Sequence, residues 1–537
     1  MPAKQLSFND EARQAMGRGV SIVGTAVATT LGPKGRNVVI QSPSGPIVTK
    51  DGVTVAKHID LEDPYEDLGA QLCKQVSAKT NDVAGDGTTT ATVLANALVA
   101  NGLKYISSGG NPISVKIGME FAASKVVEII ESLSKPIESK EQITFVATIS
   151  GNEVEVGQIV ADAMEAVGKD GVITIEESRG RETSLSLVEG MKFDKGYVSA
   201  FFVNNAEKMQ CRHTEPFILL YDGKISDPAD ILPILTKVNE QKKPIVIVAD
   251  NVDGPALQML VINVHKGAMP WVAVKTPGFA GQKKEYLYDI AALTGADVIS
   301  SEMGTTLETC TIENLGKAKS VIINKETTTI IGGEGDDAKI EDRISELKVT
   351  LSQVESDYEA RILNERIAKL SGGVAIIKVG ASTEAELIEK KYRYEDALAA
   401  TRAAVEEGIV AGGGTTLLRI SQQLGSMNNL TNDDEKVGFE IVRKSLMEPI
   451  RQIAFNAGIS PDVVVDTVCK EPNGIGLNAR TGEYVDMIQE GIIDPAKVTR
   501  SAVQNAVSIA GLVLTTEALI VDKPVTNEKV LIQEGSF

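Results

Sequence analysis

The sequence predicts a multidomain protein that is helical at both ends and mixed α/β in the middle. Its 537 residues are more than one hydrophobic core normally supports, so we expect several domains. Apolar residues recur at helical spacing in about the first and the last 130 residues. Short apolar runs of strand length, separated by helical stretches, fill the middle, as in an α/β layer structure.

The spacing of apolar residues predicts a helix as the first element, and it assigns the later helices and strands in the same way. Its apolar positions are Phe8, Ala12, Ala15, Met16, Val20, Val23 and Val27, with Asn9 or Asp10 as the expected N-cap. Short apolar or alternating runs predict strands at 38–40, 172–176, 217–221, 245–249 and 271–274. Residues 344–370 are predicted to be helical, with Leu347, Leu351, Val354 and Tyr358 on one stripe. Residues 503–521 are expected to form a buried helix, and the chain from Asp522 onward to be frayed.

Charge and composition narrow the functional classes. The chain has 54 basic and 73 acidic residues, a formal charge of −19, which disfavours nucleic acid and anionic membranes as partners. Four widely spaced cysteines, Cys73, Cys211, Cys310 and Cys469, are typical of reduced thiols in the cytoplasm. The N-terminus lacks the pattern of a signal peptide. Three histidines, His58, His213 and His265, lack the spacing of zinc ligands.

A glycine-rich turn at 85–94 is the first segment with chemical potential. Its sequence, Gly-Asp-Gly-Thr-Thr-Thr-Ala-Thr-Val-Leu, leads into an apolar helical pattern. Glycines let backbone N–H groups approach a phosphate at a helix N-terminus, and Asp86 is suited to hold Mg²⁺. The alternative is an ordinary N-cap turn without a ligand, which the motif taken alone favours.

Two further glycine-containing segments allow similar alternatives. Residues 30–36 offer amides and a basic group to a phosphate, or they form a simple surface turn. Residues 411–415 let the backbone pack against a nucleotide base or ribose, or they form a helix C-cap and loop. Neither the P-loop motif nor the complete dinucleotide-binding motif is present.

Two helical stretches in the middle, 229–238 and 256–265, are unusually apolar. In the second, Leu257, Met259, Leu260, Val261, Ile262 and Val264 populate nearly the whole circumference. Such a helix is either fully buried, which is the default, or exposes an apolar face for binding.

Together these segments resemble the group I chaperonin family, of the GroEL type, almost from end to end (Lys4 to about Val521). The matching stretches are 30–39, 50–55, 81–94, 267–278 and, most specifically, 395–414. The resemblance implies three nested domains. These are a helical equatorial domain (1–134 and 408–537), an intermediate domain (135–189 and 375–407) and an α/β apical domain (190–374), hinged at Gly190 and Gly373.

The resemblance also implies an ATP site in the equatorial domain. Its nucleotide-binding positions would be Thr30, Leu31, Gly32, Pro33, Lys50, Asp86, Gly87, Thr88, Thr89, Thr90, Gly413, Asn478, Ala479 and Asp494. Asp86 would bind Mg²⁺, and Thr30 with the Lys50 carbonyl would hold K⁺. Asp51 and Asp396 would orient the attacking water. Asp396 belongs to the intermediate domain, so hydrolysis would be gated by the movement of that domain.

The apical partners follow from the same resemblance. Non-native polypeptides and the mobile loop of a GroES-type co-chaperonin would bind Tyr197, Phe201, Phe202, Leu232, Leu235, Leu257, Val261 and Ile262. The expected activity is ATP-dependent enclosure of clients in a folding chamber. The protein would form seven-membered rings, stacked in pairs, in the cytoplasm, with no nucleic-acid or membrane partner.

Two departures from the family keep an alternative open. The tail, Glu528–Phe537, lacks the Gly-Met repeats of many relatives. Ser460 stands where a glutamate is usual at the contact between rings, although Arg451 matches a neighbouring contact residue. A passive holdase or assembly scaffold is therefore the competing interpretation. A small-molecule kinase has only residues 86–90 in its favour and no acceptor site, and it is rejected.

Overall fold

The chain folds into two compact units, one of which is built from both ends of the sequence. The computed structural model describes residues 3–41, 45–168, 171–178, 180–206, 208–267, 269–278, 281–300, 304–354, 356–425 and 430–523. Unit 1 comprises Met1–Ala161 and Ala381–Phe537, and unit 2 comprises Asp162–Gly380. Unit 2 is therefore inserted in the sequence of unit 1.

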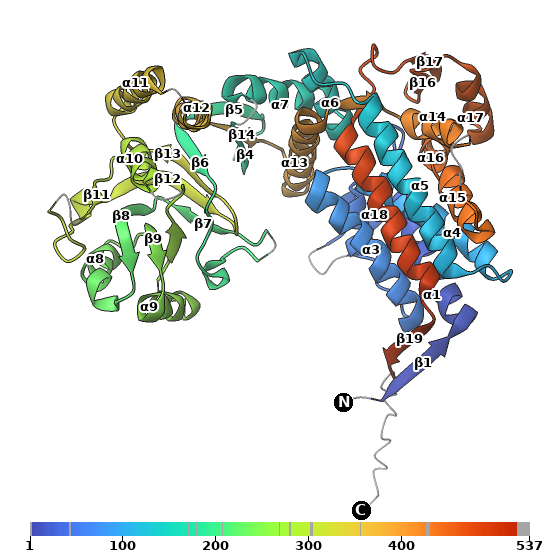
Figure 1. Cartoon of the computed structure of the whole chain (residues 1–537), viewed down its shortest axis with the longest axis horizontal. Helices are drawn as coiled ribbons and strands as arrows, with labels where there is room; N and C mark the ends of the chain where they lie inside the picture. The colour runs from blue at the N-terminus through green and yellow to red at the C-terminus, as the bar shows by residue number, and fades with distance from the viewer. Residues whose placement is uncertain are drawn as a thin grey trace, which may run out of the picture. The chain divides into compact units, whose positions relative to one another are not determined.

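Unit 1 is a helical assembly. Its main core is formed by α1 (Asn9–Ala28), α3 (Pro64–Ala84), α4 (Thr88–Ile106), α5 (Pro112–Leu133), α15 (Asp433–Ser445) and α18 (Ala496–Thr515), as Figure 1 shows. Around it lie α2 (Gly52–Lys57), α6 (Lys140–Gly151), α13 (Glu384–Glu407), α14 (Thr415–Leu424), α16 (Glu448–Asn456) and α17 (Pro461–Lys470). Helix α7 (Val154–Val167) spans the boundary between the units. The predicted helical ends of the chain are thus confirmed.

The two ends of unit 1 pair with each other. Helix α18 stops at Thr515 and the chain continues as β19 (Ala518–Asp522), which runs antiparallel to β1 (Lys4–Phe8). The predicted helix to Val521 is therefore too long, and Asp522 is not frayed because it pairs with Lys4. The predicted N-cap is also wrong. Phe8 occupies that position without a side-chain hydrogen bond, since β1 leads directly into α1.

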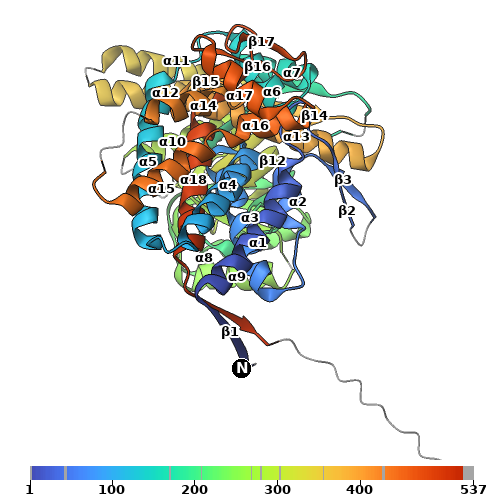
Figure 2. The same cartoon turned by 90° about the vertical axis from the view of Figure 1, so that its right-hand side faces the viewer.

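Three small antiparallel sheets complete unit 1. They pair β2 (Val38–Ile40) with β3 (Ile47–Thr49), β15 (Ile409–Ala411) with β18 (Ile493–Pro495), and β16 (Ile475–Asn478) with β17 (Glu483–Asp486). Strand β2 confirms the prediction for residues 38–40. Figure 2 shows the β2–β3 hairpin at the periphery of the unit, where Val39 and Val48 face each other and are exposed.

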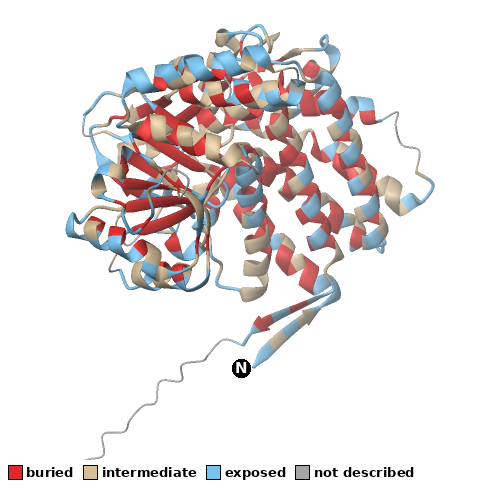
Figure 3. Cartoon of the chain, turned by 60° about the vertical axis from the view of Figure 1, so that its left-hand side comes forward, coloured by how far each residue is buried: buried red, intermediate tan, exposed pale blue. Residues whose placement is uncertain are grey.

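Unit 2 is built on an eight-stranded mixed sheet. It contains β6 (Gly190–Phe193), β7 (Cys211–Thr214), β8 (Phe217–Ile225), β9 (Ile245–Val252), β10 (Trp271–Lys275), β11 (Val298–Ile299), β12 (Gly316–Ile323) and β13 (Thr328–Gly333). Strands β10, β9, β8 and β11 are parallel, and β8, β9 and β10 confirm three predicted strands. Helices α8 (Pro228–Glu240), α9 (Gly254–His265) and α10 (Gln282–Thr294) accompany the sheet, whose strands are largely buried (Figure 3).

A second sheet of unit 2 lies where the chain enters and leaves the large sheet. It has the order β4 (Val172–Glu177), β14 (Val374–Val379), β5 (Ser184–Val188), and β4 confirms the fifth predicted strand. Gly190 and Gly373 stand at the two crossings. A Cβ at Gly190 would overlap Val374, whereas Gly373 has φ +61° and a Cβ there would lie 2.9 Å from Val188 O, so neither tolerates a side chain. Their role as hinges stays a prediction.

Two antiparallel helices, α11 (Asp337–Gln353) and α12 (Asp357–Ser371), form the end of unit 2. The region 344–370 is helical as predicted, but a break after Gln353 takes Tyr358 off the buried stripe, and its side chain is 57% exposed. The two helices are fastened to α10 by a buried carboxylate. Asp289 is fully buried and accepts hydrogen bonds from Arg343 Nε (2.9 Å) and Arg366 Nε (2.7 Å).

The three predicted domains are distributed over the two units. Both predicted equatorial segments lie in unit 1, and the predicted apical segment lies in unit 2. The predicted intermediate segments are divided, since 135–161 and 381–407 belong to unit 1 and the remainder to unit 2. The three-domain division stays a prediction. None of the described helices combines the length and apolarity needed to cross a membrane.

Candidate functional site

The start of helix α4 has no side-chain cap. Its N-cap is Gly87, with φ +80° and no side chain to satisfy the first N–H groups of the helix. The Asp86 carboxylate accepts a hydrogen bond from Gly87 N and does not cap α4. Asp86 is therefore not the cap of this turn, and phosphate binding here stays a prediction. Free N–H groups at a helix N-terminus are suited to an anion such as phosphate.

Close helix packing explains both glycines beside Asp86. Gly85 ends α3 with φ +68°, and a Cβ there would overlap Ala399 Cβ of α13. A Cβ at Gly87 would overlap Val498 of α18. Because α13 packs directly on this turn, Asp396, which precedes Ala399 by nearly one helical turn, is brought to the Asp86 region.

Asp51 reaches the same region from helix α2. Its carboxylate is the N-cap of α2 and accepts hydrogen bonds from Val53 N (3.1 Å) and Thr54 N (2.8 Å). A Cβ at Gly52 would overlap Thr89 Oγ1, so the start of α2 abuts the start of α4. Asp51 thus has a structural role as a cap in addition to its predicted role in hydrolysis.

Four carboxylates influence one another at this place. Burial raises the pKa of Asp396 well above its ordinary value, and the charges of Asp86 and Asp51 add to the rise. Burial also raises the pKa of Asp86, with a further contribution from Asp51. Burial and the Asp86 charge raise the pKa of Asp494 to about 7. No described Lys, Arg or His side chain forms an ion pair with any of the four. Among the described residues no three acidic, His or Cys side chains are arranged to hold a metal ion by themselves, so a cation bound here would need further ligands such as phosphate oxygens.

The loop 30–33 follows helix α1 and is held from a distant part of the chain. Thr30 Oγ1 donates to Val27 O (2.8 Å), and Asn456 Nδ2 of α16 donates to Leu31 O (2.9 Å). Gly32 has φ +83°, which a residue with a side chain rarely adopts. Asn456 was missed by the sequence analysis because nothing near it in the chain marks a partner more than 400 residues away.

The glycines at 412–414 form a turn between β15 and α14. The alternative of a helix C-cap is wrong, since Gly414 is the N-cap of α14. Gly413 has φ +62°, and a Cβ there would lie 2.9 Å from Met487 Cε. A Cβ at Gly412 would lie 2.9 Å from Asp494 Oδ1. The bare backbone of the turn thus faces Asp494 and the buried Met487, a residue without a motif of its own in the sequence.

The β16–β17 hairpin carries the other predicted base contacts. Asn478 Oδ1 accepts hydrogen bonds from Arg480 N (3.1 Å) and Thr481 N (3.4 Å), which fixes the turn. Ala479 is 4% exposed and packs in an apolar cluster with Leu418 and Leu477. The side chain of Ala479 is therefore part of the core, and only its backbone is available for a ligand.

The predicted Mg²⁺ and K⁺ sites agree with the kinds of oxygen donor present, but both sites stay predictions. Mg²⁺ normally keeps several waters and takes one or two carboxylates together with phosphate oxygens. Asp86, in a group of carboxylates beside a free helix N-terminus, offers that kind of donor. Thr88 is buried, whereas Thr89, Thr90 and Lys50 are half-buried around it. The K⁺ site at Thr30 and Lys50 stays a prediction.

The predicted client-binding residues of unit 2 divide into three groups. Phe201, Leu232 and Ile262 are exposed by 65%, 48% and 52%, and Tyr197, Leu257 and Val261 are half-buried. Phe202 (1%) and Leu235 (0%) are core residues, so their assignment to an exposed binding surface is corrected. In α9 only Ala256 and Leu260 are buried, and the default expectation that this apolar helix is fully buried is wrong.

The raised pKa of Asp494 predicts a pH-dependent penalty in the ligand-free protein. Its folded pKa of about 7 exceeds the unfolded value of 3.8, so the folded state binds more protons between these values and loses stability as pH rises through that range. Above pH 7 the penalty is about 4 kcal/mol. We expect Asp494→Asn to raise the thermal unfolding midpoint more at pH 8 than at pH 5. A gain that does not change with pH would contradict this account.

The helical unit with its carboxylate site and the α/β unit with its exposed apolar helix are the features of a chaperonin. Residues 23–524 match the model of the TCP-1/cpn60 chaperonin family, and the chain belongs to this family. The match confirms the predicted fold class. It supports a chaperone role in protein folding, with the nucleotide binding and ATPase activity general to the family, and an oligomeric ring that binds polypeptides.

Proposed function

We propose that this chain is a GroEL-type chaperonin subunit, which hydrolyses ATP to enclose non-native polypeptides beneath a GroES-type lid. The observation that carries the proposal is the group of carboxylates gathered at the uncapped start of α4. A nucleoside triphosphate with its divalent cation fits both features of the site. Its anionic phosphate oxygens suit the N–H groups at the start of α4, and the cation's positive charge suits the carboxylates.

The chain's own residues divide the work of phosphoryl transfer. The N–H groups of residues 88–90 and the loop 30–33 would bind the phosphates. Asp86 would hold Mg²⁺, whose charge neutralises the leaving oxygens, while backbone oxygens of Thr30 and Lys50 would hold K⁺. Asp51 and Asp396 orient the attacking water. Such catalysis rests on position and charge and needs no nucleophilic side chain.

Gating would arise from the helix that carries Asp396. Helix α13 touches the phosphate turn through Ala399 against Gly85, so a shift of α13 changes the distance between Asp396 and the turn. The charge of Asp396 responds to Asp86 and Asp51 in this conformation. Hydrolysis would then depend on whether α13 lies against the turn, and hinges at Gly190 and Gly373 would let the predicted apical segment 190–374 respond.

The client surface would be an apolar face on unit 2. Exposed side chains come from η1 (Ala200–Phe202), α8 and α9, and these elements contact one another in the order η1, α9, α8. Phe201 lies edge-on to His265 of α9, with 6.3 Å between ring centroids. We define the apolar face as Tyr197, Phe201, Leu232, Leu257, Val261 and Ile262. A surface of this kind recognises exposed apolar segments rather than a sequence, and a lid's mobile loop would use the same residues.

Removing apolar groups from this face is expected to weaken client capture strongly while ATP hydrolysis continues. In Ile262→Ser and Phe201→Ser, binding of a chemically unfolded protein should weaken at least tenfold by co-sedimentation or light scattering, because each deletes a large exposed apolar group. The matched control is Val349→Ser, which removes a 58% exposed apolar side chain from α11 of the same unit. Equal capture by all variants would remove these residues from the client surface.

Exposed apolar side chains on an isolated two-stranded sheet support assembly into rings. Leu6, Phe8 and Ile520 lie on one exposed face of the β1–β19 pair. Isolated two-stranded sheets are marginally stable in water, and a second copy would cover these faces.

Seven-membered rings stacked in pairs are proposed. Arg451 is paired with Asp462 of its own chain, and Ser460 is exposed beside them.

The competing function is a passive holdase or assembly scaffold. It is motivated by Ser460 and by the tail 528–537, which lies outside the described residues. The complete carboxylate site argues against it. Refolding of a denatured client with and without ATP and a lid protein separates the two functions. Recovery that needs both supports the proposed function, and protection without release under any nucleotide condition supports the holdase.

A further inference from the structure

The C-terminal end of α6 lies between the two halves of the candidate site. Ser150, in the last turn of α6, has a buried hydroxyl close to Asp86, where it partly offsets the rise in the pKa of that carboxyl. Phe145 of the same helix occupies the space beside Gly491, just before β18, which carries Asp494. The end of α6 therefore borders both the phosphate turn and the β18 side of the site.

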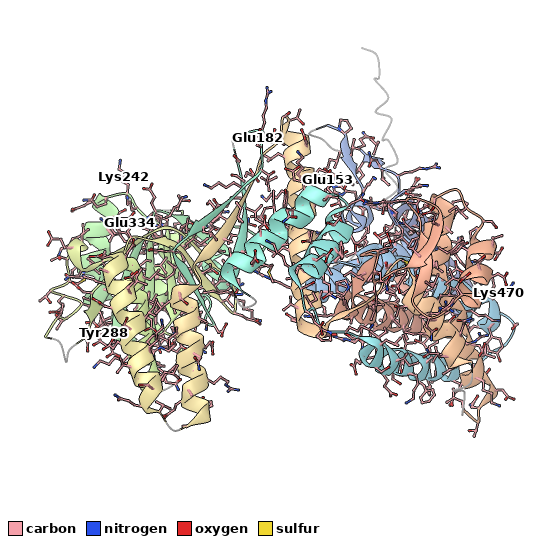
Figure 4. The ribbon with its side chains drawn as sticks, turned by 90° about the horizontal axis from the view of Figure 1, so that it is seen from above. Glu153, Glu182, Lys242, Tyr288, Glu334 and Lys470 are labelled. Carbon is pink, nitrogen blue, oxygen red and sulfur yellow. The ribbon has the colours of Figure 1, made fainter. Side chains whose placement is uncertain are left out.

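Two arginines from different elements hold this end. Asn152, the C-cap of α6, accepts a hydrogen bond on Oδ1 from Arg480 Nη2 (3.1 Å). Glu153, labelled in Figure 4, forms an ion pair with Arg393 of α13. Arg480 stands in the turn of the β16–β17 hairpin, directly after Ala479. The Arg480 contact thus joins the hairpin on one side of the site to the α6 end on the other.

We infer that Arg480 and Asn152 form a latch that sets how long a nucleotide stays in the site. The inference rests on the proposed nucleotide site. The contact is solvent-exposed, so it can open and close without burying an unpaired charge. In the closed state the contact would hold the α6 end and the hairpin together and block the exit of a bound nucleotide between them. When the Arg480–Asn152 contact opens, the α6 end and the β16–β17 hairpin can move apart.

Because a second contact also holds the α6 end, the protein is expected to fold without the Arg480–Asn152 contact. The Arg393–Glu153 ion pair still fastens the α6 end to α13 when Arg480 is removed. The hairpin turn is also independent of the Arg480 side chain, because it is fixed by Asn478 and by Gly482 N donating to Asn478 O (2.7 Å). Variants of the latch are therefore expected to fold and to retain their secondary structure.

Asn152 allows an unusually clean deletion. It has φ +56°, a left-handed conformation in which glycine is relaxed and alanine is strained. Asn152→Gly thus removes the amide and keeps the backbone. Arg480→Ala removes the donor, and Arg480→Lys retains charge with a different donor geometry. Lys470→Ala is the matched control, because it removes one positive charge from unit 1 at a place far from Glu153 in Figure 4.

The test is the dissociation rate of a fluorescent methylanthraniloyl-ADP from the full-length protein with Mg²⁺, chased by excess ADP. We expect Arg480→Ala and Asn152→Gly each to release the nucleotide about fivefold faster, and the double variant to be no faster than either. Arg480→Lys should be intermediate, and Lys470→Ala unchanged. In single turnovers with bound ATP, the hydrolysis rate should stay at the parental value in all of them.

Four outcomes would overturn the latch. Release at the parental rate from both single variants would show that the contact does not restrain the nucleotide. Faster release from Arg480→Ala alone, or additive effects in the double variant, would mean that Arg480 acts on the nucleotide directly. Failure of the parent protein to bind the fluorescent ADP would remove the nucleotide site itself, and the latch with it.

Discussion

Replacing Asp396 by alanine is expected to leave nucleotide binding nearly intact and to lower the rate of ATP hydrolysis about 10²–10⁴-fold. Asp396 is proposed to orient the attacking water, which is needed in the transition state and not for binding. Its carboxylate is also buried among like charges, so its removal relieves repulsion in the ligand-free site. The measurements are equilibrium binding of a fluorescent nucleotide and phosphate release in single turnovers.

Two further variants separate the carboxylate from its surroundings. Asp396→Asn keeps the shape and removes the charge, and it should be as slow as Asp396→Ala. Glu395→Gln, one residue away, removes a charge that contributes to the raised pKa of Asp396 but leaves the proposed water-orienting group in place, and it should retain most of the parental activity. Phosphate release at the parental rate in Asp396→Ala would show that its assignment is wrong.

The second large effect is expected at Asp289, with a loss of about 3–5 kcal/mol in the stability of unit 2 when it is replaced by alanine. Arg366 donates to both oxygens of the Asp289 carboxylate (Nε to Oδ2, 2.7 Å, and Nη2 to Oδ1, 2.8 Å), and Arg343 Nε donates to Oδ1 (2.9 Å). Glu285 contacts both arginines but is itself 46% exposed in its side chain. Deleting Asp289 therefore leaves two largely buried guanidinium groups with only partly exposed partners, namely Glu285 for both arginines and Glu346 for Arg343.

The single tryptophan makes this measurement specific. Trp271 is 5% exposed in the core of unit 2, so its fluorescence during urea unfolding reports on that unit. Glu346→Gln is the control, because Glu346 pairs with Arg343 at the surface with 65% side-chain exposure, and it should cost less than about 1 kcal/mol. A similar shift in the urea midpoint for both variants would mean that the buried Asp289 contributes no more to the stability of unit 2 than the exposed Glu346.

Local patterns marked the glycine-rich turns of the candidate site, and the family resemblance supplied its other positions. Gly85 and Gly87 are required by left-handed backbone and close helix contacts, and both requirements are visible in the sequence as glycine around Asp86. Strands of the large sheet were predicted because each is a short apolar run. The convergence of Asp51, Asp86 and Asp396 was not visible in any pattern. It depends on the packing of α2, α4 and α13, and only the family resemblance anticipated it.

The remaining misses have two physical causes. Asn456, Met487 and Arg480 act through contacts with segments far away in sequence, which periodicity and local motifs do not record. Phe202 and Leu235 were placed on a binding surface because they resemble apolar positions of the family. Within one apolar helix or turn, however, the side chain that faces the sheet and its neighbour that faces solvent have the same composition, and only the fold distinguishes them.

The pairing of β1 with β19 has a consequence for synthesis on the ribosome. Helices α1 to α5 emerge first, but their core is completed by α18, and the edge of unit 1 closes only when residues 518–522 meet residues 4–8. Translation at about 5–20 residues per second makes the early helices wait tens of seconds while the whole of unit 2 is made. Helices α1 to α5 thus spend that time with an incomplete apolar core.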